Sequence, residues 1–102
     1  GRLPKDGDQV SILYIGKLTD GTVFDSSEFH NNQPFTFTVG GGGVIKGWDL
    51  AVRKMRLNKS MIVEIPSKLG YGIKGAGNGK IPPNSNLIFK MTMTNIIRSQ
   101  HT

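Results

Sequence analysis

The sequence has no cysteine, so disulfide bonds and thiolate metal ligands are excluded. Histidine is also scarce: His30 and His101 are the only two, and their separation does not fit a typical metal site. No apolar run approaches the roughly 20 residues that a membrane-spanning helix needs, so we expect no membrane partner. Because no secretory signal is visible, we expect a cytoplasmic location.

Recognisable cofactor motifs are missing as well. Residues 70–75 fit the spacing G-x-G-x-x-G, but that fingerprint binds a pyrophosphate only where a helix follows it. Glycines and prolines between positions 77 and 83 forbid such a helix. Residues 40–43 are all glycine but lack the Gly-Lys-Ser/Thr of a phosphate loop. We therefore expect no nucleotide cofactor and no metal.

Acidic residues are outnumbered, with 7 Asp and Glu against 13 Lys and Arg and a net charge of +6. Such a balance would suit nucleic acid or an acidic surface. The basic residues, however, are scattered along the chain, which favours a role in solubility. We expect no nucleic-acid partner, and nucleic-acid binding remains an alternative that rests on charge alone.

One helix stands out among the patterns that are present. Trp48, Ala51, Val52 and Met55 recur at i, i+3, i+4 and i+7, which places them on one face of a helix. Asp49 lies in the expected first turn and basic residues lie in the last, as the helix dipole favours. The pattern predicts a helix from Trp48 that ends at Asn58, because asparagine tolerates a left-handed cap.

The remaining regular structure reads as short strands. Residues 9–18, 22–25, 34–39, 61–65 and 86–97 show the alternation or the apolar content of strands. Asp20-Gly21 predicts a tight hairpin between the first two. The polar stretch 26–33 is expected to be a loop, and the glycine-rich stretch 67–83 a long loop of the kind that is usually functional.

The predicted fold is therefore α+β, with a bent antiparallel β-sheet wrapped around one short helix. A chain of 102 residues is the size of one domain, so we expect residues 1–102 to form a single unit. The start at Gly1-Arg2 is compatible with excision from a longer chain, and a targeting segment could precede it. We expect this unit to act as a monomer.

Aromatic residues cluster beside the predicted loops. Most aromatics in a small domain belong to its core, but two features favour a pocket. Asp25 follows Phe24 directly and places a carboxylate beside apolar surface, which is costly unless the charge is paired. Tyr71 stands in a glycine-rich loop, where a core role is less natural. An apolar pocket with a few polar groups is typical of a site for a small ligand or a peptide.

Several motifs follow one another in the order of a known family. They are Tyr14 with Gly16, the run from Asp20 to Ser27, Pro34-Phe35-Thr36-Phe37, Val44-Ile45-Lys46-Gly47-Trp48, Tyr71-Gly72, and Ile81-Pro82-Pro83-Asn84 with Leu87 and Phe89. Over nearly its whole length the chain resembles the FKBP-type peptidyl-prolyl isomerases, the macrolide-binding immunophilins. The resemblance implies the FKBP-like fold and the isomerisation of X–Pro bonds without a cofactor. It also leaves open a scaffold module that binds peptides or macrolides without turnover.

The resemblance also implies roles for individual residues. Asp25, Tyr71 and Phe89 would be catalytic, and the Ile45 amide and the Tyr71 hydroxyl would donate hydrogen bonds to ligand carbonyls. Trp48 would form the floor of the pocket. The substrate-binding residues would be Tyr14, Phe24, Phe35, Val44, Ile45, Trp48 and Ile81. The implied partners are proline-containing peptides and proteins, macrolides, and a protein partner of the macrolide complex.

This sequence departs from the family pattern in three places. The chain begins after the family's first strand, so we expect an edge of the sheet to lack its strand partner. The family's pocket arginine is missing, and His30 or Asn31 falls near its place. The loop before Ile81 is one residue longer. Without the arginine, Asp25 needs another partner, for which we propose His30; backbone and hydroxyl donors such as that of Tyr14 are the rivals.

Overall fold

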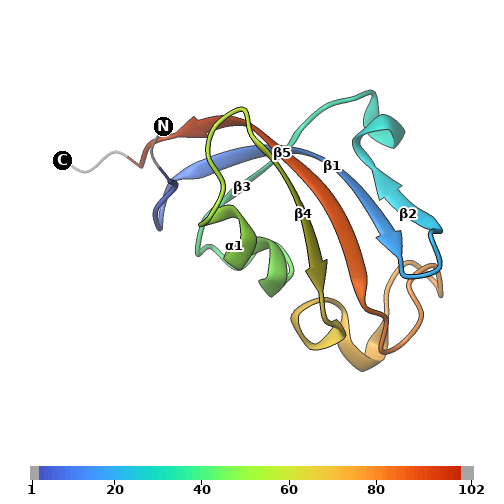
Figure 1. Ribbon diagram of the computed structural model, residues 1–102. Helices are drawn as coiled ribbons and strands as arrows, with labels where there is room; N and C mark the ends of the chain where they lie inside the picture. Colours follow the sequence, from blue (N-terminus) through green and yellow to red (C-terminus); the bar gives the residue numbers. More distant parts are fainter. Residues whose placement is uncertain (1–2, 100–102) are drawn as a thin grey trace.

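The computed structural model describes residues 3–99 and shows a curved sheet with one α-helix in its hollow (Figure 1). The sheet has five strands, all paired antiparallel, in the order β2-β1-β5-β4, with β3 pairing to β1 beside this path. The elements are β1 (Gln9–Leu18), β2 (Val23–Ser26), β3 (Phe35–Thr38), α1 (Lys46–Val52), β4 (Ser60–Ile65) and β5 (Leu87–Ile97). The predicted bent sheet around one helix is confirmed, and every strand lies where the residue pattern predicted it, with ends that differ by at most one residue.

The two long strands form the centre of the sheet. β1 pairs with β5 from Gln9 opposite Ile97 to Leu18 opposite Leu87. The Asp20-Gly21 turn joins β1 to β2. Tight hairpin turns need a residue with a positive φ, and Gly21 supplies it with a φ of 91°. The Asp20 carboxylate accepts a hydrogen bond from the Thr22 amide at 2.9 Å, which fixes the turn.

The helix is shorter than the sequence pattern predicted. Its apolar face is confirmed, since Trp48, Ala51, Val52 and Met55 are all buried. The predicted end at Asn58 is wrong, because α1 ends at Val52 and only turns follow it. Asn58 does adopt a left-handed φ of 64°, but its amide donates to Met93 of β5 at 2.7 Å. Pairing to the sheet therefore draws the chain away from the helix axis before another helical turn can form, and the basic residues expected in the last turn lie beyond the helix.

The predicted loops contain short 3-10 turns. Ser27–His30, Ser67–Leu69 and Gly72–Lys74 are 3-10 helices. The first corrects the loop expected over 26–33, and the Ser26 hydroxyl begins it by accepting a hydrogen bond from the Glu28 amide at 3.2 Å. Within residues 3–99, no α-helix follows residues 70–75.

The core lies between α1 and the concave side of the sheet. The alternating residues of β5 face it, and Leu87, Phe89, Met91 and Met93 are at most 3% exposed. Ile65 of β4 is also buried, whereas Met61 and Val63 pack only partly against the core. The other fully buried side chains include Val10, Ile12, Val39 and Val52. Among residues 3–99, no helix has the length and apolar character needed to span a bilayer.

Candidate functional site: an aromatic pocket over Trp48

Trp48 lies at the first turn of α1, where the helix meets the sheet, and only 5% of it is exposed. Aromatic rings from three strands stand almost upright on it. Its centroid lies 5.1 Å from that of Tyr14, 5.3 Å from Phe89 and 6.0 Å from Phe35, with interplanar angles of 75°, 84° and 78°. Edge-to-face contacts of this kind stabilise a fixed arrangement of rings. The result is a rigid apolar floor with an aromatic wall on each side.

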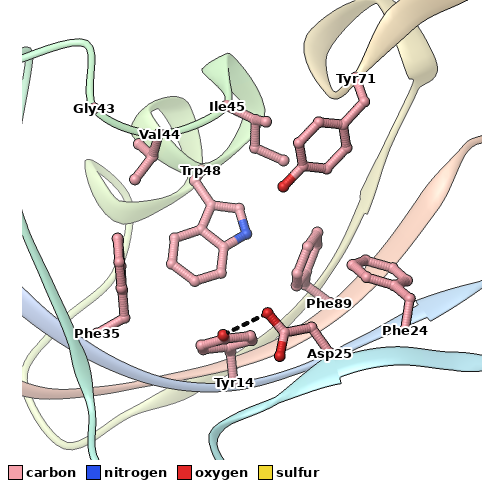
Figure 2. Close-up of a pocket in the computed structure, with 10 residues that line it drawn as sticks. All are labelled: Tyr14, Phe24, Asp25, Phe35, Gly43, Val44, Ile45, Trp48, Tyr71 and Phe89. Atoms are coloured by element: carbon pink, nitrogen blue, oxygen red, sulfur yellow. Dashed lines mark hydrogen bonds between the residues drawn. The ribbon is translucent and has the colours of Figure 1, made fainter. Parts of the chain in front are cut away.

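The rings surround a cavity of about 180 Å³. Its walls come from β1, β2, β3, β5, α1 and the two glycine-rich segments (Figure 2). The residues that line it are Tyr14, Phe24, Asp25, Phe35, Gly43, Val44, Ile45, Trp48, Tyr71 and Phe89. The structure thus brings together nine of the ten predicted site residues. It also explains why Gly16 accompanies Tyr14, because a Cβ at Gly16 would lie 2.7 Å from the rings of both Phe24 and Phe89.

Asp25 is the one carboxylate in the lining, and its oxygens are well paired. Oδ2 accepts a hydrogen bond from the Tyr14 hydroxyl at 2.8 Å, and Oδ1 accepts one from the Ser26 amide at 2.8 Å. Burial tends to raise the pKa of Asp25, but the hydrogen bonds from Tyr14, His30 and Ser26 and the nearby His30 charge lower it below the usual value of 3.8 overall. Asp25 is therefore ionised at neutral pH.

His30 pairs with Asp25 at the edge of the pocket. Its Nε2 lies 3.0 Å from Oδ1 of Asp25, which confirms the predicted pair. The Tyr14 hydroxyl, which was the alternative partner, also donates a hydrogen bond to Asp25, so both expected partners bind the carboxylate. The His30 side chain is 59% exposed, so the pair lies at the rim, where solvent screens the interaction.

Polar groups of three lining residues have no hydrogen-bond partner within the described chain: the Ile45 amide, the Tyr71 hydroxyl and the buried indole Nε1 of Trp48. Within residues 3–99 no hydrogen bond uses the Ile45 amide N–H or the Tyr71 hydroxyl. Figure 2 shows the Tyr71 hydroxyl pointing into the pocket above Asp25. Burial, and then the negative charge of Asp25, raises the pKa of Tyr71, so its hydroxyl keeps its proton. The Ile45 amide and the Tyr71 hydroxyl are therefore donors that no group in residues 3–99 occupies.

Ile81 and Gly43 differ from the sequence expectation. Ile81 does not line the cavity; its side chain is buried in the core, and its backbone pairs with Ala76. Gly43 lines the cavity but was not expected to do so. The only signal for it in the sequence is its place at the end of the four-glycine run, directly before Val44. In the described chain, no group of three or more His, Asp or Glu residues is arranged to hold a metal.

Residues 1–94 match the model of a family described as FKBP-type peptidyl-prolyl cis-trans isomerase. The chain belongs to this family. An FKBP-type domain catalyses cis–trans isomerisation of X–Pro peptide bonds. The resemblance of the motifs is thereby confirmed, as is the predicted FKBP-like fold.

Individual relatives agree with the family assignment. FK506-binding protein 1 of Dictyostelium discoideum is 46% identical over 93 residues, which are 91% of this chain and 85% of that protein. FKBP53, a peptidyl-prolyl cis-trans isomerase of Arabidopsis thaliana, is 46% identical over 94% of this chain, but the match covers only 20% of its own length. The crystal structure of FkpA from Escherichia coli superposes with a TM-score of 0.85 and 34% identity, over 98% of this chain and 45% of that one.

Proposed function

We propose that this FKBP domain binds the proline ring of an X–Pro segment on Trp48 and isomerises the preceding peptide bond inside the aromatic pocket. The observation that carries the proposal is the aromatic cavity whose lining residues include two unpartnered donors, the Ile45 amide and the Tyr71 hydroxyl. Such donors can hold the carbonyls beside the bond while the proline ring is fixed. The bond can then rotate without release of the peptide.

The pocket lowers the barrier by its preference for the twisted amide. Rotation about the C–N bond costs roughly 18–20 kcal/mol because the planar amide is stabilised by resonance. The twisted state loses this resonance and much of the polarity of the amide. An apolar site that removes water from the amide therefore binds the twisted state better than the planar one, which is catalysis by differential binding. Tyr14, Phe24 and Phe89 supply the apolar walls for this step.

Asp25 contributes a fixed negative charge at one side of the cavity. It orients the Tyr14 ring through their hydrogen bond, and it lies below the Tyr71 hydroxyl in the view of Figure 2. We propose that its field disfavours the planar amide, whose carbonyl oxygen carries more negative charge than that of the twisted amide. Asp25, Tyr71 and Phe89 are thus the proposed catalytic residues, because each lines the cavity and would touch a peptide bound there.

Exchange spectroscopy by NMR tests the activity on a short peptide with an apolar residue before proline. The domain should speed cis–trans exchange, and Phe89→Ala should lower kcat/KM by about tenfold or more, because it removes a wall of the pocket. Ile62→Ala is the matched control, since Ile62 is 74% exposed and lies outside the pocket lining. Equal exchange rates with and without the folded protein would contradict isomerase activity and would favour the alternative, a module that binds peptides without turnover.

We also propose that the pocket binds macrolides of the tacrolimus and rapamycin type. Trp48 is the only tryptophan and lies under the proposed ligand, so its fluorescence should change on binding. The change should saturate with ligand concentration, and Phe35→Ala should weaken the binding. Calorimetry that detects no heat and no competition with the peptide would contradict the proposal.

The remaining expectations about partners are proposals of the same kind. We infer that the domain works as a monomer in the cytoplasm on proline-containing chains that are folding. A bound macrolide would leave part of its surface exposed at the open mouth of the pocket, where a protein partner could contact the ligand and the rim together. Slow proline isomerisation, which takes tens to hundreds of seconds at 25 °C, is the step such a domain would accelerate.

A further inference from the structure

One wall of the pocket is formed by residues 40–45, a segment that contains no strand and precedes the helix α1. Gly43, Val44 and Ile45 line the cavity, and they follow three further glycines (Figure 2). Glycine loses more conformational freedom on folding than any other residue, so this wall is costly to order. A Cβ at position 42 or 43 would meet no atom within 4 Å, so little packing restrains these positions. Something else must fix the path of the wall.

Asp49 contacts this wall segment at both ends. Its side-chain Oδ1 accepts a hydrogen bond from the Gly40 amide at 2.7 Å. Its own backbone amide donates to the Ile45 carbonyl at 3.4 Å, beside the bond from Trp48 to the same carbonyl at 3.0 Å. The segment 40–45 is therefore closed into a loop by one residue of α1, next to the tryptophan that forms the floor.

The Asp49 carboxylate is itself held in place. Its second oxygen accepts hydrogen bonds from Nε and Nη2 of Arg53, at 3.2 and 2.9 Å, one turn further along the chain. Arg53 also forms an ion pair with Asp6, in the turn before β1. The Asp49 side chain is only 22% exposed. Oδ2 of Asp49 thus accepts two hydrogen bonds from Arg53, and Oδ1 accepts one from Gly40. These three bonds hold the carboxylate in the orientation that binds the Gly40 amide.

We propose that Asp49 is a positioning residue for the substrate site, which holds the wall 40–45 so that Val44 and the Ile45 amide face the ligand. This inference rests on the proposed function of the pocket. Asp49 does not line the cavity, so its effect must pass through the wall. The wall contributes to binding of the ground state and the twisted state alike, so its loosening should raise KM and leave kcat little changed.

Three variants separate the hydrogen bond from the charge. Asp49→Ala removes the acceptor for Gly40, and KM for the peptide should rise about three- to tenfold with kcat within twofold of wild type. Asp49→Asn keeps a side-chain oxygen for the Gly40 amide and should restore most of the affinity. Arg53→Met removes the donors that orient the carboxylate and should give an intermediate KM. All rates are measured well below the melting temperature of the least stable variant.

A second measurement does not depend on catalysis. Hydrogen exchange of the Gly40 amide, which donates to Asp49, should be faster in Asp49→Ala than in wild type or Asp49→Asn, while exchange in β5 stays the same. If wild type does not isomerise peptides, the proposed function fails, and the exchange rates still decide whether Asp49 fixes the wall. Equal exchange in all variants, or a lower melting temperature with an unchanged KM, would show that Asp49 only stabilises the helix and would overturn the inference.

Discussion

At the scale of single residues, Asp25 makes the stability of the fold depend on pH. Its carboxylate accepts hydrogen bonds from Tyr14 and Ser26 and pairs with His30, and these contacts lower its pKa in spite of burial. A carboxyl group whose pKa is lower in the folded state than in the unfolded state stabilises the fold at pH values above its unfolded pKa. That stabilisation is lost as the pH falls from the unfolded value through the folded one.

Denaturant unfolding from pH 7 to pH 2 checks this dependence. Wild type should lose stability relative to Asp25→Asn between pH 4–5 and the lowered pKa of Asp25, and the two stability curves should run parallel above that range. Tyr14→Phe, which removes one donor, should reduce the pH-dependent part without abolishing it. A difference between wild type and Asp25→Asn that stays constant down to pH 2 would mean that the contacts of Asp25 do not lower its pKa.

At the scale of elements, α1 must approach β4 closely for Trp48 to form the floor of the pocket. Gly47 makes this approach possible, since a Cβ there would lie 2.5 Å from Cγ2 and 2.8 Å from Cδ1 of Ile65. Ile65 is only 1% exposed, so its side chain has little room to move. The helix and the strand therefore meet at a glycine, and the depth of the pocket depends on that contact.

Gly47→Ala should destabilise the domain although alanine is the better helix former. The helix preference of alanine over glycine contributes about 0.5–1 kcal/mol in its favour, whereas overpacking a rigid core costs about 1–3 kcal/mol. We expect a net loss of up to about 2 kcal/mol in the free energy of unfolding, measured with urea. Ile65→Ala in the same chain should relieve the clash, so the double variant should be more stable than the sum of the single effects implies. Additive losses would contradict the contact.

The same elements show what the sequence could and could not predict. Alternation within a strand is local, so the bounds of β1 and the inward face of β5 follow from the residue pattern alone. The end of α1 depends on Asn58 pairing with Met93, which lies 35 positions away and leaves no trace in the helical pattern. In the pocket, side-chain chemistry and family order indicated most of the lining. Ile81 and Gly43 could not be assigned in this way, because loop geometry decides which of them faces the cavity.

At the scale of the whole molecule, the net charge of +6 raises the question of nucleic acid. The basic residues lie on several elements, including Lys17 on β1, Lys59 before β4 and Lys90 on β5. Arg53 is bound to Asp6 and Asp49, and Lys80 lies over the Phe29 ring at 5.9 Å from its centroid. Cations that are dispersed or already engaged neutralise few phosphates of one duplex at the same time.

We therefore expect no detectable binding to duplex DNA at physiological salt, measured by fluorescence anisotropy. At low salt a weak association should appear, because any net positive charge attracts a polyanion, and it should disappear steeply as salt releases the counterions. Lys17→Glu on β1 and Lys54→Glu after α1 should weaken the low-salt association equally, since only net charge matters in that case. Tight binding at physiological salt, or a much larger effect of one substitution than of the other, would reveal a specific basic surface and make nucleic acid a second partner of this isomerase domain.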